Sequence, residues 1–159
     1  MKTHTILLRY LALAGLAIVL AACASTPTQP LDSYAHQSTR GDIDLYWSCA
    51  WSEPRVLQVK GVAVSQFYTS PVQDLEFRLT GLNAQGVTVS RVSRAANEYE
   101  IPMMAQSPFQ LTLRTTGTEA GFDLAYNYFI QESGGGKGEG GYSGEKSNVA
   151  KNVCPVVKP

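Results

Sequence analysis

Apolar and polar residues alternate along most of the chain after Gly41, and this period of two predicts β-strands rather than helices. In the clearest segment, apolar residues occupy every second position: Phe122, Leu124, Tyr126, Tyr128 and Ile130. Phe129 falls on the opposite face of the same segment, among polar residues. The pattern therefore predicts a strand with one buried face, and it makes Phe129 a candidate contact residue on the other.

Similar alternation predicts further strands within residues 43–51, 56–64, 75–79, 87–89, 109–113 and 148–153. The β-branched run at 56–64 is typical of a strand that is buried on both faces. Val87 and Val89 alternate with polar residues, and the preceding residues 83–86 end in glycine, as a hairpin turn does. Short strands joined by turns predict an all-β fold, an antiparallel β-sandwich of seven or eight strands.

Four segments carry a resemblance to a known family: Gly61-Val62-Ala63-Val64, Asp74-Leu75-Glu76-Phe77-Arg78-Leu79, Gly86-Val87, and Ser107-Pro108-Phe109-Gln110-Leu111-Thr112-Leu113. Their order resembles FxLYD-type immunoglobulin-like domains of bacterial envelope proteins. Phe77-Arg78-Leu79 matches the family's F-x-L, while Thr80-Gly81 stands where the family has Tyr-Asp. The resemblance covers roughly residues 56–130. It implies an immunoglobulin-like sandwich and no catalytic chemistry.

The chain begins with a short basic segment and an uncharged apolar run over residues 10–22. A membrane-spanning helix needs roughly 18 to 25 apolar residues, whereas a secretory signal needs about 7 to 15. The run ends in Leu20-Ala21-Ala22-Cys23, which resembles the lipobox of bacterial lipoproteins. That resemblance implies a signal peptide over 1–22 and a lipid on Cys23. The alternative is an ordinary secretory signal that is cut after Ala22.

Ala24 follows the lipobox cysteine, and in enteric bacteria lipoproteins without Asp at this position generally go on to the outer membrane. The resemblance thus implies an outer-membrane lipoprotein that faces the periplasm, with surface display as the alternative. Residues 24–41 are rich in Ser, Thr, Gln and Pro. We therefore expect Cys23 and a flexible tether over 23–41, and a folded domain over 42–159.

Two cysteines remain once Cys23 carries the anchor, and a secreted chain favours pairing them. A Cys49–Cys154 disulfide would join the start of the domain to its end. Trp47 and Trp51 share the predicted strand face with Cys49. The core interpretation packs these indoles against the disulfide, and the alternative is an exposed aromatic strip for a sugar or a protein.

The charge balance and the histidine count limit the function classes. The formal net charge is +0, which lacks the basic excess of nucleic-acid-binding proteins. His36 is the only histidine after the signal segment, and it falls in the expected tether, where it could not act as a fixed base. Asp42 and Asp44 share a strand face, but no third metal ligand follows closely. We expect no enzyme activity, no metal and no cofactor.

A glycine-rich segment, residues 132–146, contains G-x-G-x-x-G at 136–141. No helix can follow through that much glycine, so a dinucleotide site is disfavoured and a long hairpin loop is expected. Lys137, Glu139 and Tyr142 in this loop are candidate contacts for a partner.

Together these features predict a non-enzymatic lipoprotein that is held in the membrane by its lipid and binds an envelope protein or assists envelope assembly. Two alternatives stay open. A periplasmic hydrolase acting on envelope polymer would need convergent carboxylates in a cleft. A small-ligand carrier would need a cavity inside the sandwich, with the glycine-rich loop as a lid.

Overall fold

A computed structural model describes residues 29–67, 70–131 and 143–156 of the chain, except for the side chains of Gln131 and Ser143. The chain divides into two units, Met1–Pro30 and Leu31–Pro159. The expected signal segment and Cys23 lie outside the described residues. All the strands belong to the second unit.

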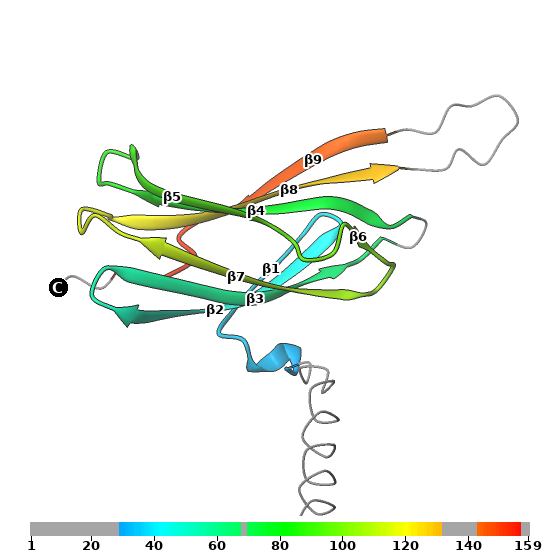
Figure 1. Cartoon of the computed structure of the whole chain (residues 1–159), viewed down its shortest axis with the longest axis horizontal. Coiled ribbons are helices and arrows are strands. Elements are labelled where there is room, and N and C mark those ends of the chain that lie inside the picture. Colours follow the sequence, from blue (N-terminus) through cyan, green and yellow to red (C-terminus); the bar gives the residue numbers. More distant parts are fainter. Residues whose placement is uncertain (1–28, 68–69, 132–142, 157–159) are drawn as a thin grey trace, which may run out of the picture. The chain divides into compact units, whose positions relative to one another are not determined.

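The second unit is a sandwich of two antiparallel sheets (Figure 1). The first sheet has the order β1 (His36–Arg40), β2 (Ile43–Glu53), β3 (Val56–Ser65) and β7 (Gln106–Arg114). The second has the order β5 (Thr88–Ala95), β4 (Val72–Leu82), β8 (Gly121–Gln131) and β9 (Ser143–Ala150), and β6 (Glu100–Ile101) pairs with β4. The predicted all-β antiparallel sandwich is confirmed.

The connections follow the immunoglobulin-like pattern. The chain crosses between the sheets from β3 to β4, from β6 to β7 and from β7 to β8. As a result, β2, β3 and β7 lie side by side in one sheet and β4, β8 and β9 in the other. These triplets correspond to strands A-B-E and C-F-G of immunoglobulin-like domains. The nine described strands exceed the predicted seven or eight because β1 and the two-residue β6 were not foreseen.

The core lies between the sheets and is built from the alternating apolar positions. On β8 these are Phe122, Leu124, Tyr126, Tyr128 and Ile130, all at most 2% exposed. The rings of Phe77 on β4 and Phe109 on β7 stack at 4.2 Å between centroids, so the two sheets meet directly at this point. Residues 61–65 of β3 are buried on both faces, whereas residues 56–60 alternate and Lys60 is exposed, so the prediction for 56–64 is confirmed only in its second part.

The tether prediction is wrong for its second half. Leu31–Ser33 forms a 3₁₀ turn, and His36–Arg40 forms β1, which pairs with β2 from His36↔Trp47 to Arg40↔Ile43. The polar composition misled the prediction because β1 is an edge strand that contributes little to the core. None of its five residues is fully buried.

The orientation of the hairpin between β4 and β5 also corrects the sequence interpretation. The turn at 83–86 is confirmed, since Gly86 has a φ of +75° and its amide donates to the Asn83 carbonyl at 2.9 Å. Val87 is 58% exposed, however, whereas the polar Ser90 is buried. A register shift at Gly81 of β4 accompanies this inversion, and the missing side chain of Gly81 leaves room for Ser90.

Candidate functional site

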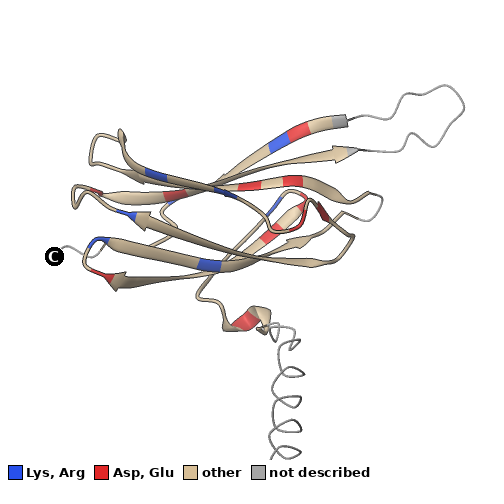
Figure 2. Ribbon diagram, in the orientation of Figure 1, with Lys and Arg blue, Asp and Glu red and all other residues tan. Residues whose placement is uncertain are grey.

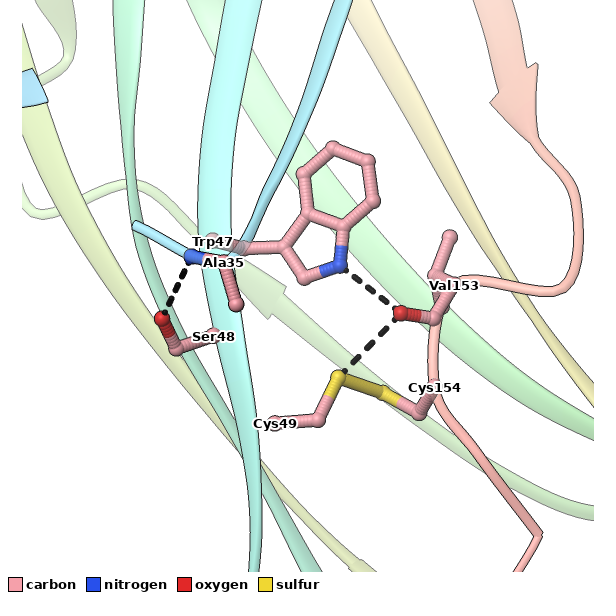
Figure 3. Close-up of a disulfide and its surroundings, with 6 residues drawn as sticks. All are labelled: Ala35, Trp47, Ser48, Cys49, Val153 and Cys154. Carbon is pink, nitrogen blue, oxygen red and sulfur yellow. Dashed lines mark hydrogen bonds between the residues drawn. A yellow bond between two sulfur atoms is a disulfide. The ribbon is translucent and has the colours of Figure 1, made fainter. Parts of the chain in front are cut away.

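The disulfide joins the two sheets on the side of the sandwich where β1 and β9 are the outer strands. Cys49 on β2 is bonded to Cys154, which follows β9, with 5.8 Å between their Cα atoms. The predicted pairing is confirmed. Trp47 lies beside it, and its Nε1 donates to the Val153 carbonyl at 3.0 Å (Figure 3). The second dashed line to that carbonyl is a 3.3 Å contact with Cys49 Sγ, which carries no hydrogen in the disulfide.

Both tryptophans belong with the core rather than with an exposed strip. Trp47 is only 4% exposed, and Trp51 is partly buried against Phe122, with an edge contact at 6.0 Å between ring centroids. His36 stacks on Trp47 at 5.6 Å. Its position in β1 corrects the expectation that this histidine lies in a flexible tether.

A polar cluster forms the second connection between the sheets on this side. Asp42, in the turn between β1 and β2, accepts hydrogen bonds from Tyr128 Oη at 3.0 Å and from Lys146 Nζ at 2.8 Å. Tyr126 Oη donates to the carbonyl of Arg40 at 2.9 Å. Lys146 Nζ also lies 5.3 Å from the ring centroid of Phe67. The turn is thus held by β8 and β9 of the opposite sheet.

The electrostatics of this cluster favour neutral tyrosines. Burial raises the pKa of Tyr126 to about 12, and the nearby carboxylates Asp44 and Asp42 add to the shift. Burial also raises the pKa of Tyr128, as does its hydrogen bond to Asp42. Burial raises the pKa of Asp44 as well, although a hydrogen bond with Gln66 opposes the shift.

Between these two connections lies a groove of about 730 Å³. Residues 35–40 line one wall and residues 149–153 line the other, with Trp47 between them. We call this feature the β1–β9 groove. One wall is β1 with Ala35, and the other is the end of β9 with residues 151–153 that follow it, so backbone groups as well as side chains face the groove.

A second hollow, a mostly apolar cleft of about 860 Å³, lies where the β2–β3 turn, the β7–β8 connection and the segment after Cys154 meet. Trp51, Phe122 and Val156 supply apolar lining, and Arg55 and Glu119 supply charge. The indole Nε1 of Trp51 is buried and has no hydrogen-bond acceptor among the described residues. We call this hollow the Trp51 cleft.

Glu119 is a structural carboxylate at the edge of this cleft. One carboxylate oxygen accepts from Ser90 Oγ at 2.7 Å and from the Thr116 amide at 2.8 Å, and the other accepts from the Gly117 amide at 2.9 Å. Burial alone would raise the pKa of Glu119, but these hydrogen bonds outweigh it and the pKa is lowered. A carboxyl with a lowered pKa is a poor proton donor near neutral pH.

Of the four residues predicted to contact a partner, the structure describes only Phe129. Phe129 lies on the outer face of the second sheet, partly exposed, between Gln73 of β4 and Glu145 of β9. Lys137, Glu139 and Tyr142 lie outside the described residues. The last four residues of the predicted loop, 143–146, belong to β9, which begins five residues earlier than the sequence predicts.

Charged residues are interspersed over both sheets (Figure 2). Within the described ranges, no three His, Cys, Asp or Glu side chains are grouped as metal ligands are, and no helix is long and apolar enough to cross a membrane. Asp42 and Asp44 do not act together, since Asp42 binds Tyr128 and Lys146 while Asp44 interacts with Gln66. No protein-family model matches the chain, and no curated protein matches it.

Proposed function

We propose that this chain is a lipid-anchored protein of the bacterial envelope that binds another envelope protein without catalysing a reaction. The lipobox-like Leu20-Ala21-Ala22-Cys23 supports secretion and lipidation, and the immunoglobulin-like connectivity agrees with the FxLYD-type resemblance. The outer membrane, facing the periplasm, is the proposed location. The single observation that carries the binding role is the β1–β9 groove, where the unpaired edge of β1 faces the end of β9 and the residues that follow it.

Few residues of the sequence separate the proposed anchor at Cys23 from β1. Only residues 24–30 separate Cys23 from the 3₁₀ turn at Leu31–Ser33. An extended chain spans at most about 3.6 Å per residue, so this segment reaches no more than about 25 Å. A partner of the domain would therefore be an integral or peripheral protein of the same membrane, or a periplasmic segment that approaches it.

Lipidation and partner binding are tested separately in cells. Metabolic labelling with an alkyne fatty acid is expected to mark the wild-type chain and to leave Cys23→Ser unmarked, with Cys23→Ser released from the membrane fraction. Reversible crosslinking of the wild-type chain, followed by mass spectrometry, is expected to recover one envelope protein in near-stoichiometric amount. Retention of label in Cys23→Ser would contradict the anchor, and the absence of any stoichiometric protein would contradict the binding role.

A second candidate function, carriage of a small amphipathic molecule, is favoured by the Trp51 cleft. Its apolar lining and the unpaired Trp51 Nε1 suit a ligand with an apolar body and a hydrogen-bond acceptor. The cleft includes Phe122 near the start of β8, and residues 132–142 of the glycine-rich segment lie outside the described residues. Quenching of Trp51 fluorescence by a brominated fatty acid, lost in Trp51→Phe, would support carriage. Unchanged fluorescence would count against it.

The hydrolase alternative gains no support from the described carboxylates. Glu119 is the buried acid at the Trp51 cleft, and its oxygens are occupied by Ser90, Thr116 and Gly117. A retaining or inverting glycosidase needs one carboxyl with a raised pKa, whereas the pKa of Glu119 is lowered. We therefore place the binding role first.

A further inference from the structure

The β1–β9 groove has one open strand edge along its whole length, that of β1, and the last two residues of β9 on its other wall. In the described structure, β1 pairs with β2 only and β9 pairs with β8 only. Every second residue of an edge strand directs its amide and carbonyl away from the sheet, where they lack a strand partner. A peptide in an extended conformation can satisfy these groups by adding one strand to the sheet.

The two ends of the groove are fixed, which sets the length of segment it accepts. At one end Trp47 Nε1 is bonded to the Val153 carbonyl next to the disulfide. At the other end the β1–β2 turn meets β9, where a Cβ on Gly41 would lie 3.1 Å from the Asn148 side chain. Residues 35–40 form the wall between these ends. At about 3.4 Å per residue, that wall matches roughly six extended residues.

The charges that line the groove are basic. Arg40 and Lys151 are both exposed and are the lining residues with a full positive charge, while the lining includes no Asp or Glu. Two carboxylates near the groove are engaged in hydrogen bonds. Asp42 accepts from Tyr128 and Lys146, and Asp123 accepts from the Asn152 amide at 3.1 Å. Opposite charge on a partner is therefore favoured, and a basic partner is disfavoured.

We propose that the β1–β9 groove binds an extended acidic segment of another protein as an added β-strand. This inference rests on the proposed function and names the class of partner segment. Backbone hydrogen bonds to β1 or β9 hold the segment, and Arg40 and Lys151 select acidic side chains. Val149, which is 47% exposed on the β9 wall, offers apolar contact to the residues between them.

The first test uses synthetic peptides and the folded, disulfide-bonded domain. The probe is a peptide of about eight residues that alternates Glu and Thr, long enough to span the wall. Backbone amide signals of residues 36–40 and 149–151 are expected to shift in ¹⁵N–¹H spectra at low salt. A peptide that alternates Lys and Thr controls for charge, and the Glu–Thr peptide with alternate backbone nitrogens methylated controls for strand pairing. Both controls are expected to bind at least roughly ten-fold more weakly.

A matched pair of variants locates the binding site. Lys151→Glu reverses a charge in the groove, and Lys60→Glu makes the same change at an exposed position on β3, outside the lining. Binding of the Glu–Thr peptide is expected to weaken about ten-fold in Lys151→Glu and to change less than about two-fold in Lys60→Glu. Both side chains are exposed, so we expect both variants to fold, and the same spectra report this.

Three results would overturn the proposal: equal binding of the Glu–Thr and Lys–Thr peptides, full binding of the methylated peptide, or shifts confined to residues outside the groove. No shift at millimolar Glu–Thr peptide would overturn it as well. If crosslinking recovers a stoichiometric partner but the peptide does not bind, the proposed function stands and the groove is not the binding site. If the peptide binds but no partner is recovered, the proposed cellular function is contradicted instead.

Discussion

The two long sides of the sandwich are joined in different ways. On one side the outer strands β5 and β7 lie in contact with each other. Ser90 of β5 donates to Glu119, and Ser107 of β7 donates to Glu98 in the connection after β5 at 2.6 Å. On the other side the two sheets are joined at two places, the disulfide with Trp47 and the cluster around Asp42, with the β1–β9 groove between them.

The comparison shows that the two sheets can be held together on one side while the outer strands on that side stay accessible to another protein. The close approach of β5 and β7 leaves less room for another strand between them. Connections at the two ends of the β1–β9 groove hold the sheets together while leaving the edge of β1 between them uncovered. Exposed edges invite pairing with other chains, and proteins usually protect them. An uncovered edge between fixed ends is therefore a reason to look for a partner on this side.

The largest expected effect comes from removing the disulfide on the groove side. The Cys49–Cys154 bond closes a loop with a sequence separation of 105 residues. The chain-entropy model gives a stabilisation of about 4 to 5 kcal/mol for a loop of this size. We expect the Cys49→Ser/Cys154→Ser double variant to lose about that much free energy of unfolding in urea titrations. A loss below about 1 kcal/mol would show that packing around Trp47 alone joins the sheets there.

The second effect concerns the opposite side. Glu119→Gln replaces charge-assisted hydrogen bonds to Ser90, Thr116 and Gly117 with weaker ones and leaves a backbone amide poorly satisfied. Hydrogen bonds to a charged group contribute about 1.5 to 3 kcal/mol, so we expect a loss of about 2 kcal/mol at pH 7.

The pH dependence of the same variant checks the cause. The pKa of Glu119 is lowered from its usual 4.5, so its contribution is fully present above pH 4.5 and disappears as the pH falls through the folded value. The difference in the free energy of unfolding between wild type and Glu119→Gln should therefore become smaller as the pH is lowered from 7 into the acid range. If the free energies of unfolding differ by the same amount at every pH in this range, the stabilisation by Glu119 does not depend on its charge.

A smaller effect is expected at the second connection beside the groove. Tyr126→Phe removes the hydroxyl that donates to the Arg40 carbonyl, and a neutral hydrogen bond contributes about 1 kcal/mol. The pKa of Tyr126 is raised to about 12, so its contribution is complete below pH 10, the usual tyrosine value, and declines as the pH rises toward 12. Absorbance at alkaline pH should show Tyr126 ionising late, and this late step should be missing in Tyr126→Phe.

The smallest effect is expected for the ion pair in the same cluster. Lys146 and Asp42 are 43% and 26% exposed in their side chains, and such pairs usually contribute less than about 1 kcal/mol. We expect Lys146→Met to lower the free energy of unfolding by about 0.5 kcal/mol in low salt and by less in 1 M NaCl, because salt screens exposed charges. A loss that high salt does not reduce would assign the contribution to the contact between Lys146 and Phe67 instead.

The core strands were predictable because burial and alternation coincide in them. In β8, for example, the apolar residues at every second position from Phe122 to Ile130 are the ones that lie in the interior of the sandwich. The disulfide was predictable because assigning Cys23 to the anchor leaves two cysteines in a chain that is expected to be secreted. The β4–β5 hairpin shows the limit, because the register shift at Gly81 turns Val87 outward and Ser90 inward, and alternation alone carries no information about a shift.

The groove could not be predicted because its two walls have little sequence signal. Residues 36–40 read HQSTR, with no apolar alternation, so composition favours a tether over a strand. Their strand conformation depends on pairing with β2, a contact that composition does not specify. His36 contributes to this pairing, because it lies opposite Trp47 in the register and stacks on its ring. Arg40 and Lys151 lie far apart in the sequence and meet only through the fold.

Site-specific photocrosslinking in cells tests most directly whether the groove side is the binding side. A benzophenone amino acid replaces Thr39 on β1, Phe129 on the outer face of the second sheet, or Thr112 on β7 as an exposed control. We predict that Thr39 captures one envelope protein and that Thr112 captures none, with Phe129 showing whether the partner extends over the second sheet. Capture from Phe129 or Thr112 without capture from Thr39 would contradict the account.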